Sequence, residues 1–330
     1  MRLAVVVWNQ HSDPPSLRAG WVLRLYGERL HVKDWIDLRA QVQRHVDRGL
    51  ILGDVSAEAF AMFLYSSNYY RVSGYARSFY EGDSDRYRAN VRAAQVMEVY
   101  DLDRAVRNSV LDGISVVEPT LRSRVAYHLT QAIGGGDAYL DPALYLPAVP
   151  EVDVSDPGHR RWHSEAGNRN AVLRDFNAVQ NRDEIFIRHH LDRGDPVPLW
   201  AAIEVVSIGT FSRLLRALRD KSILEPVARS IHIEDVPKLL QAVQNIAFLR
   251  NIAAHHGRLW NRRINGHVAL PAIALKVKRE YLAPKTPAAA LTLLAGMVDQ
   301  IESGNSYSTQ LLDLVHSVPG LEQGYYRPTL

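Results

Sequence analysis

The sequence contains no cysteine among its 330 residues, which excludes both a disulfide framework and a thiolate metal site. It also lacks any apolar run close to the roughly 20 residues of a membrane-spanning helix. Residues 3–7 follow Arg2 in the manner of a signal peptide, but Asn9, Gln10 and Asp13 interrupt that run before any cleavage site. We therefore expect a cytoplasmic protein that makes no membrane contact.

A strong net charge is missing too, since the formal net charge is +3 and the isoelectric point is near 9.0. A balance this close to neutral does not identify a nucleic-acid ligand, so the local clustering of charge has to decide. The hydrophobic fraction of 47% and the charged fraction of 23% are those of an ordinary soluble globular protein. A chain of this length suits one large domain or a core with appendages.

Alternating strand patterns and internal repeats are absent, and apolar residues recur at helical spacing along most of the chain. The expected fold class is therefore all-α, a helical bundle with helical extensions at both ends. The chain divides into an extension at residues 1–33, an N-terminal helical segment at 34–90, a helical core at 91–282 with an irregular insertion at about 134–170, and a C-terminal helical extension at 283–330.

Side chains that can cap helices precede four of the periodic stretches. They are Asp34, Ser56, Asp235 and Thr286, the last followed by a proline suited to the first helical turn. Residues 93–131 are also periodic, with soft breaks at Gly113 and Pro119. The stretch 199–211 is apolar on nearly every side, which predicts one helix central to the core.

The densest chemistry lies in residues 250–262 (RNIAAHHGRLWNR), which place three arginines and two histidines around two alanines. On a straight helix Asn251 and His255 lie about 40° apart, whereas Arg250 and His255 lie about 140° apart. The arginine and the histidine can therefore meet only if the helix end bends or if a second copy of the chain completes the cluster. No metal ligand set accompanies them, so we expect neither a metal nor another cofactor.

Arginine, asparagine and histidine together suit the cleavage of RNA, which carries its own nucleophile in the 2′-OH. A neutral histidine can remove the hydroxyl proton, and an arginine fork can neutralise the phosphate. The expected products are a 2′,3′-cyclic phosphate and a 5′-OH, and DNA should resist. From spacing alone, a helix end whose arginine and histidines complement the helix dipole is the simpler interpretation.

Three further features have alternative interpretations. Residues 68–80 hold five aromatics with Arg71 and Arg77, and they form either a surface that stacks bases or a packing corner. Glu204 lies inside an apolar stretch and needs a partner there, either as a structural ion pair or as a group that orients a catalytic residue. Arg122 and His128 repeat an arginine–histidine spacing and could form a second catalytic pair, but a surface histidine near a helix end explains the pattern adequately.

Residues 250–262 look like the signature of the Abi-like family of bacterial abortive-infection proteins, of the AbiD/AbiF type. The similarity extends in order over roughly residues 35–282. Its other blocks are residues 68–75 (NYYRVSGY), 100–107 (YDLDRAVR) with Glu118, Leu121 and Arg122, and 198–209 (PLWAAIEVVSIG). Residues 1–30 and the helices after Thr286 lie outside the similarity.

The resemblance implies an α-helical HEPN domain whose arginine–histidine motif is a metal-independent ribonuclease site, usually completed across a homodimer. It also implies phage defence or toxin activity, with a structured noncoding RNA or an antitoxin as a partner in some relatives. Carried onto this chain, the pair is Arg250 with His255, Asn251 is the polar residue of the motif, and His256 can substitute for His255. Many relatives have cysteine where this chain has Ala253.

The hypothesis is thus an endoribonuclease in which His255 acts as general base or acid and Arg250 stabilises the phosphate. The RNA backbone would be bound by Arg258, Arg262, Arg263 and Arg71, with Glu204 in a supporting role. One rival is a non-catalytic binder of a structured RNA or a partner protein in a defence or toxin–antitoxin system. The other rival treats the motif as a dimer interface only.

Overall fold

The computed structural model describes residues 34–147, 159–264, 266, 268, 270–277 and 282–329. Within these ranges the chain forms α-helices and short 3-10 helices, and it contains isolated β-bridges but no strand. The all-α expectation is confirmed. The expected extension at residues 1–33 and the middle of the expected insertion, residues 148–158, lie outside the described residues. No helix in the described part combines the length and the apolar character that crossing a membrane requires.

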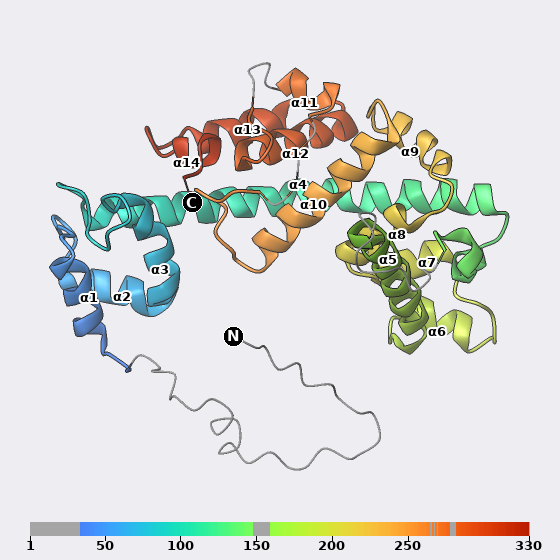
Figure 1. Cartoon of the computed structure of the whole chain (residues 1–330), viewed down its shortest axis with the longest axis horizontal. Coiled ribbons are helices and arrows are strands. Elements are labelled where there is room, and N and C mark those ends of the chain that lie inside the picture. The colour runs from blue at the N-terminus through green and yellow to red at the C-terminus, as the bar shows by residue number, and fades with distance from the viewer. Residues whose placement is uncertain are drawn as a thin grey trace, which may run out of the picture.

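Helix α4 (Ala93–Ile133) is the axis of the molecule (Figure 1). Its 41 residues extend over about 60 Å, and the other helices lie along it or at its two ends. The soft breaks expected at Gly113 and Pro119 leave it continuous. Gly113 is needed for packing, because a Cβ atom there would overlap the hydroxyl group of Tyr307. Pro119 faces solvent, where water can satisfy the carbonyl that loses its helical partner.

Three helices pack at the N-terminal end of α4, namely α1 (Leu38–Asp47), α2 (Ala57–Ser67) and α3 (Tyr69–Ala76). Ser56 caps α2 as expected, since its hydroxyl accepts a hydrogen bond from the amide of Ala59 at 3.1 Å. The cap predicted at Asp34 is wrong. Asp37 caps α1 instead, and Trp35, which precedes the helix, is 85% exposed.

Five helices form the opposite end, namely α5 (His159–Asn177), α6 (Ile185–Leu191), α7 (Leu199–Val205), α8 (Ile208–Ala217) and α9 (Glu225–Ser230). The irregular insertion predicted for about 134–170 is wrong from residue 159 onward, because α5 starts there. Its first residues are mostly polar and show no apolar periodicity. The single central helix predicted for 199–211 is wrong. Val206 is extended, and the hydroxyl of Ser207 accepts from the amide of Thr210, so a second helix starts there.

The chain then crosses α4 in helix α10 (Val236–Ala254) and returns along it in α11 (Ala272–Val277), α12 (Pro287–Glu302), α13 (Ser306–Val315) and α14 (Gln323–Tyr326) (Figure 1). Asp235 and Thr286 cap α10 and α12 as predicted, each followed by a proline in the first turn. The C-terminal helices therefore cover one side of α4, and the last residues lie close to the loop that follows α10.

Candidate functional site

The helix that carries residues 250–254 ends one residue before His255. His255 is the C-cap of α10, with φ −91° and ψ 12°. The next two amides turn back into the helix, since His256 N–H donates to the Ala253 carbonyl at 3.1 Å and Gly257 N–H donates to the Ile252 carbonyl at 2.8 Å. This pattern is the Schellman motif. The periodic pattern predicts a helix from Val236 to His256, and the structure ends it at Ala254 because this cap turns the backbone out of the helix.

His256 occupies the left-handed position of this cap, with φ +53°. Glycine is the usual residue there because it has no Cβ atom, and a non-glycine residue costs about 1 kcal/mol or more. Arg71 on α3 donates a hydrogen bond to the His256 carbonyl. A contact from a distant part of the sequence therefore holds the strained residue in place.

Arg258, in the loop that follows, is bound to the same helix. Its guanidinium donates to the carbonyl of Gly74 and lies over the ring of Tyr75, 5.9 Å from the centroid. Burial lowers the pKa of Arg258 from its ordinary value, since desolvation disfavours the charged form. The phosphate contact expected of Arg258 would have to compete with this carbonyl.

The buried carboxylate of Asp103 on α4 is the centre of the loop's attachment. It accepts from the backbone amides of Leu259 at 3.1 Å and Trp260 at 2.8 Å, and from the hydroxyl of Tyr75 at 2.5 Å. Arg107, four residues further on, pairs with the same group. Asp103 was not identified from the sequence. This residue interrupts the apolar face of its helix, and a charge on a buried face requires partners.

The C-terminal residues close the loop from the other side. Trp260 donates through its indole N–H to the Leu321 carbonyl at 2.7 Å, and the Asn261 amide donates to the Gly324 carbonyl at 2.8 Å. Tyr325 donates its hydroxyl to Asp103 at 3.2 Å. The segment predicted to be an appendage therefore takes part in positioning the residues that follow the histidines.

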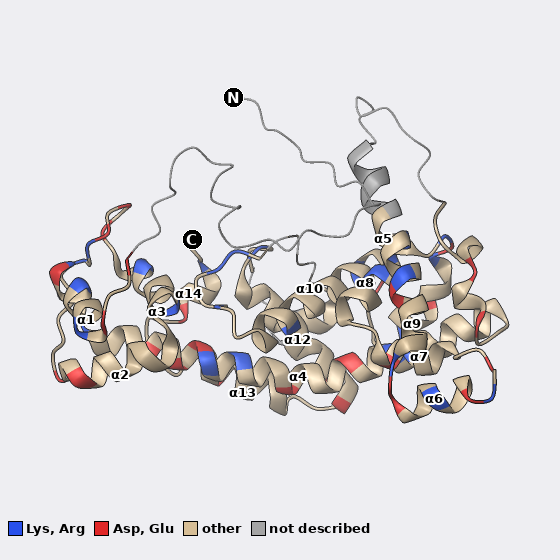
Figure 2. Ribbon diagram, turned by 90° about the horizontal axis from the view of Figure 1, so that it is seen from below, with Lys and Arg blue, Asp and Glu red and all other residues tan. Residues whose placement is uncertain are grey.

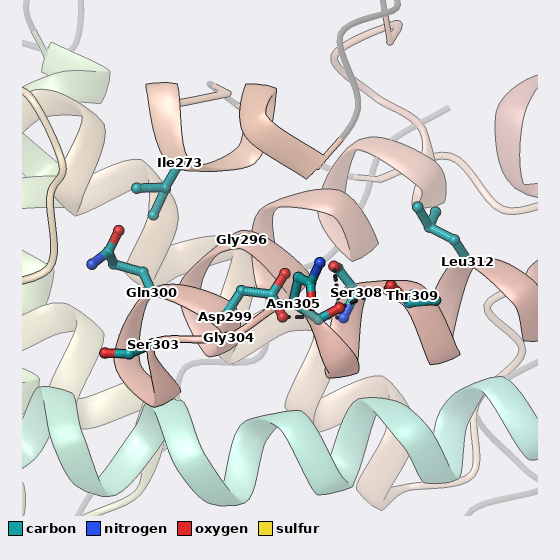
Figure 3. Close-up of a pocket in the computed structure, with 10 residues that line it drawn as sticks. All are labelled: Ile273, Gly296, Asp299, Gln300, Ser303, Gly304, Asn305, Ser308, Thr309 and Leu312. Carbon is teal, nitrogen blue, oxygen red and sulfur yellow. Dashed lines mark hydrogen bonds between the residues drawn. The ribbon is translucent and has the colours of Figure 1, made fainter.

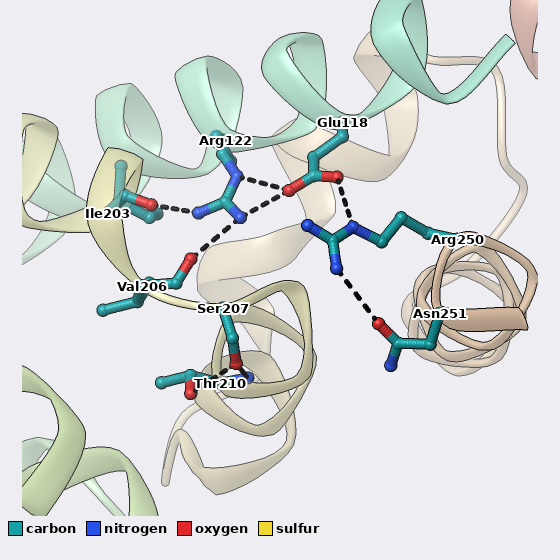
Figure 4. Close-up of polar contacts among 8 residues, drawn as sticks. All are labelled: Glu118, Arg122, Ile203, Val206, Ser207, Thr210, Arg250 and Asn251. Carbon is teal, nitrogen blue, oxygen red and sulfur yellow. Dashed lines mark hydrogen bonds and ion pairs between the residues drawn. The ribbon is translucent and has the colours of Figure 1, made fainter. Parts of the chain in front are cut away.

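Arg250 lies at the opposite side of this turn, against α4 (Figure 4). Its Nε is 3.9 Å from a carboxylate oxygen of Glu118, and its Nη1 donates to the Asn251 side chain at 3.3 Å. Glu118 also accepts from Arg122, which is buried and donates to the carbonyls of Ile203 and Val206. Arg122 is thus a structural residue, while Arg250 is held only loosely.

The two imidazoles of the motif are left without partners. His255 and His256 are exposed, and within the described residues neither ring makes a hydrogen bond, an ion pair or an aromatic contact. Arg263 is exposed in the same way, and Arg262 lies over the Phe248 ring at 5.7 Å. Lys and Arg residues gather in the loops next to α3 and α14 (Figure 2). The site is an open, basic surface.

Two other predicted site residues lie elsewhere. Glu204 on α7 is exposed, so the expectation that it is a carboxylate within the core is wrong; α7 has only seven residues and its outer side faces solvent. Glu204 lines a pocket of about 540 Å³ with Trp200 and Tyr127. His128 packs edge-on against Tyr127 at 5.1 Å, and nothing brings it to the motif.

A second pocket, of about 480 Å³, lies between α12 and α13 (Figure 3). Asp299 lines it and accepts from the backbone amide of Ser308 at 3.2 Å, so its carboxylate serves the start of α13. No residue of the 250–262 motif lines either pocket. In the described part of the chain, no group of three or more histidine, aspartate or glutamate side chains is placed to hold a metal ion.

Comparison with known proteins gives one match. The family model described as Abi-like protein matches residues 62–261, which run from the middle of α2 through α10 and the loop up to Asn261. No curated protein and no solved structure matches the chain.

Proposed function

The chain belongs to the Abi-like family, whose members act in abortive-infection defence against phage, and on that premise we propose that it is a metal-independent endoribonuclease of the HEPN type. The substrate is RNA. The site consists of Arg250, Asn251 and His255, with His256 beside them.

In the proposed reaction the ribose 2′-oxygen attacks the adjacent phosphorus while the bond from phosphorus to the 5′-oxygen breaks. His255 accepts the proton of the 2′-OH, and the departing 5′-oxygen receives a proton from an imidazolium or from water. Arg250 neutralises the charge that builds on the phosphate, and Asn251 orients the guanidinium to which it is hydrogen bonded. The products are a 2′,3′-cyclic phosphate and a 5′-hydroxyl.

One observation carries the proposal. An exposed and unpartnered imidazole stands at the end of α10, within a turn of an arginine whose only carboxylate contact in the described residues is 3.9 Å long. The cap requires a left-handed residue beside it, and this chain has His256 there, where glycine would be unstrained. Strain of this kind is typical of functional sites.

The test is incubation of purified protein with end-labelled RNA in EDTA, followed by mapping of the product ends. His255→Ala is expected to lower the cleavage rate by at least about 100-fold, because general acid–base catalysis contributes that much or more. The matched control is His189→Ala, an exposed histidine on α6, which should cleave at the wild-type rate. RNA that binds to the wild-type protein but is never cut would support the non-catalytic alternative instead.

We further propose that a homodimer completes the site, because Arg250 and His255 do not share a helix face. Variants Arg250→Ala and His255→Ala, each inactive alone, should regain part of the activity when mixed, since one site of the mixed dimer then has both groups. Mixing would restore nothing if each chain carried its own complete site. A controlling structured RNA or antitoxin and a cytoplasmic location belong to the same proposal.

A further inference from the structure

Helix α3 is fixed to the histidine loop at two points. Arg71 donates to the carbonyl of His256, and Arg258 donates to the carbonyl of Gly74. Each contact joins an arginine side chain of one segment to a backbone carbonyl of the other, so α3 and the loop are linked in both directions. Any side chain that α3 presents to solvent therefore has a defined place relative to His255.

Tyr70 is the large side chain that α3 presents. It is 69% exposed. Its backbone amide is held by the Asn68 side chain at 2.9 Å, and its ring packs edge-on against Tyr69 at 5.8 Å between centroids. On a helical wheel Tyr70 and Gly74 lie about 40° apart, so the ring stands on the side of the Arg258 contact.

The surroundings of Tyr70 favour an anionic occupant. Residues 68–80 and 250–264 contain no aspartate or glutamate. Together they carry six arginines: Arg71, Arg77, Arg250, Arg258, Arg262 and Arg263. The phosphate backbone of a nucleic acid is attracted to a surface of this charge.

We propose that Tyr70 is a stacking platform for an unpaired base of single-stranded RNA whose backbone passes the histidines. An aromatic face stacks any base, so the platform selects single strands and not a sequence. In a duplex the bases are already stacked on one another and do not reach the ring. This inference rests on the proposed function, which supplies the path of the RNA past the histidines. It adds that the substrate is single-stranded RNA.

The experiment measures binding of a fluorescent single-stranded 12-nucleotide RNA by anisotropy, with all variants made in the His255→Ala background so that no RNA is consumed. Tyr70→Ala is expected to raise Kd about 5- to 150-fold, the equivalent of about 1–3 kcal/mol for one stacked base. Tyr70→Trp should bind at least as tightly as Tyr70. The matched control is Tyr127→Ala, which removes a 66% exposed tyrosine from α4 and should leave Kd unchanged.

The proposal is overturned if Tyr70→Ala and Tyr127→Ala bind alike, if a duplex of the same sequence loses as much affinity as the single strand, or if the protein does not bind single-stranded RNA at all. Binding and cleavage separate the two claims. Wild-type cleavage with no effect of Tyr70 on binding removes only the stacking platform. Tyr70-dependent binding by a protein that never cleaves RNA removes only the catalytic function.

Discussion

Two carboxylates on α4 hold opposite sides of the turn that carries the histidines, and they do so differently. Each pairs with an arginine four residues later, Asp103 with Arg107 and Glu118 with Arg122. They lie 15 residues apart on α4, about 22 Å along its axis. Asp103 is fully buried, while the side chain of Glu118 is 17% exposed.

The difference between them is the number of donors that each carboxylate binds. Asp103 accepts from two backbone amides, two tyrosine hydroxyls and Arg107, which fills its oxygens. Glu118 accepts from Arg122 and meets Arg250 only at 3.9 Å. A saturated carboxylate fixes the backbone, whereas an unsaturated one leaves its arginine free to make other contacts. The first therefore positions the loop and the second keeps Arg250 available.

Of the three tests of this comparison, the removal of Asp103 should give the largest loss of stability. Asp103→Ala leaves the Arg107 charge buried and unpaired, together with two backbone amides, and should lower the free energy of unfolding by about 3–5 kcal/mol. Asp101→Ala is the matched control, because its pair with Arg104 is exposed and is worth about 0–1 kcal/mol. Urea denaturation measures both values. A loss below 1 kcal/mol for Asp103→Ala would contradict the structural role.

Disturbing the contact between α14 and the loop that carries Trp260 should give an intermediate loss of stability. A Cβ atom at Gly324 would overlap the indole of Trp260, so Gly324→Ala should lower the free energy of unfolding by about 1–3 kcal/mol through overpacking. Gly304→Ala is the control, since no atom lies within 4 Å of a Cβ built there. Thermal unfolding of both variants checks this. Equal melting temperatures would show that α14 does not support the loop.

The Arg250–Glu118 pair should give the smallest effect. A double-mutant cycle with Arg250→Ala and Glu118→Gln is expected to yield a coupling free energy below about 1 kcal/mol, because Arg250 is 38% exposed and the pair is long. Urea denaturation of the four proteins measures it. A coupling of several kcal/mol would mean that Glu118 fixes Arg250 as firmly as Asp103 fixes the loop, and it would remove the contrast.

Much of the helix plan could be predicted from the sequence, because caps and periodicity are local signals. Ser56, Asp235 and Thr286 mark helix starts where the structure has them. The gathering of Arg250, Asn251, His255 and His256 at one helix end was also predictable, since these residues are close in the sequence. Whether they are catalytic stays a prediction.

The attachments of the site were not predictable, because they join residues far apart in the chain. Arg71 meets His256 across 185 positions, and Asp103 meets Trp260 across 157. The same rule about buried charges that would have identified Asp103 was applied to Glu204, which proved exposed. Whether a side chain is buried depends on which side of its helix packs against another element. The sequence pattern does not reveal that the side of α7 carrying Glu204 faces solvent.

The left-handed backbone at His256 has a consequence for how this protein can change. Glycine would suit that position better, so a lineage selected only for heat resistance would be expected to exchange the histidine for glycine and gain stability.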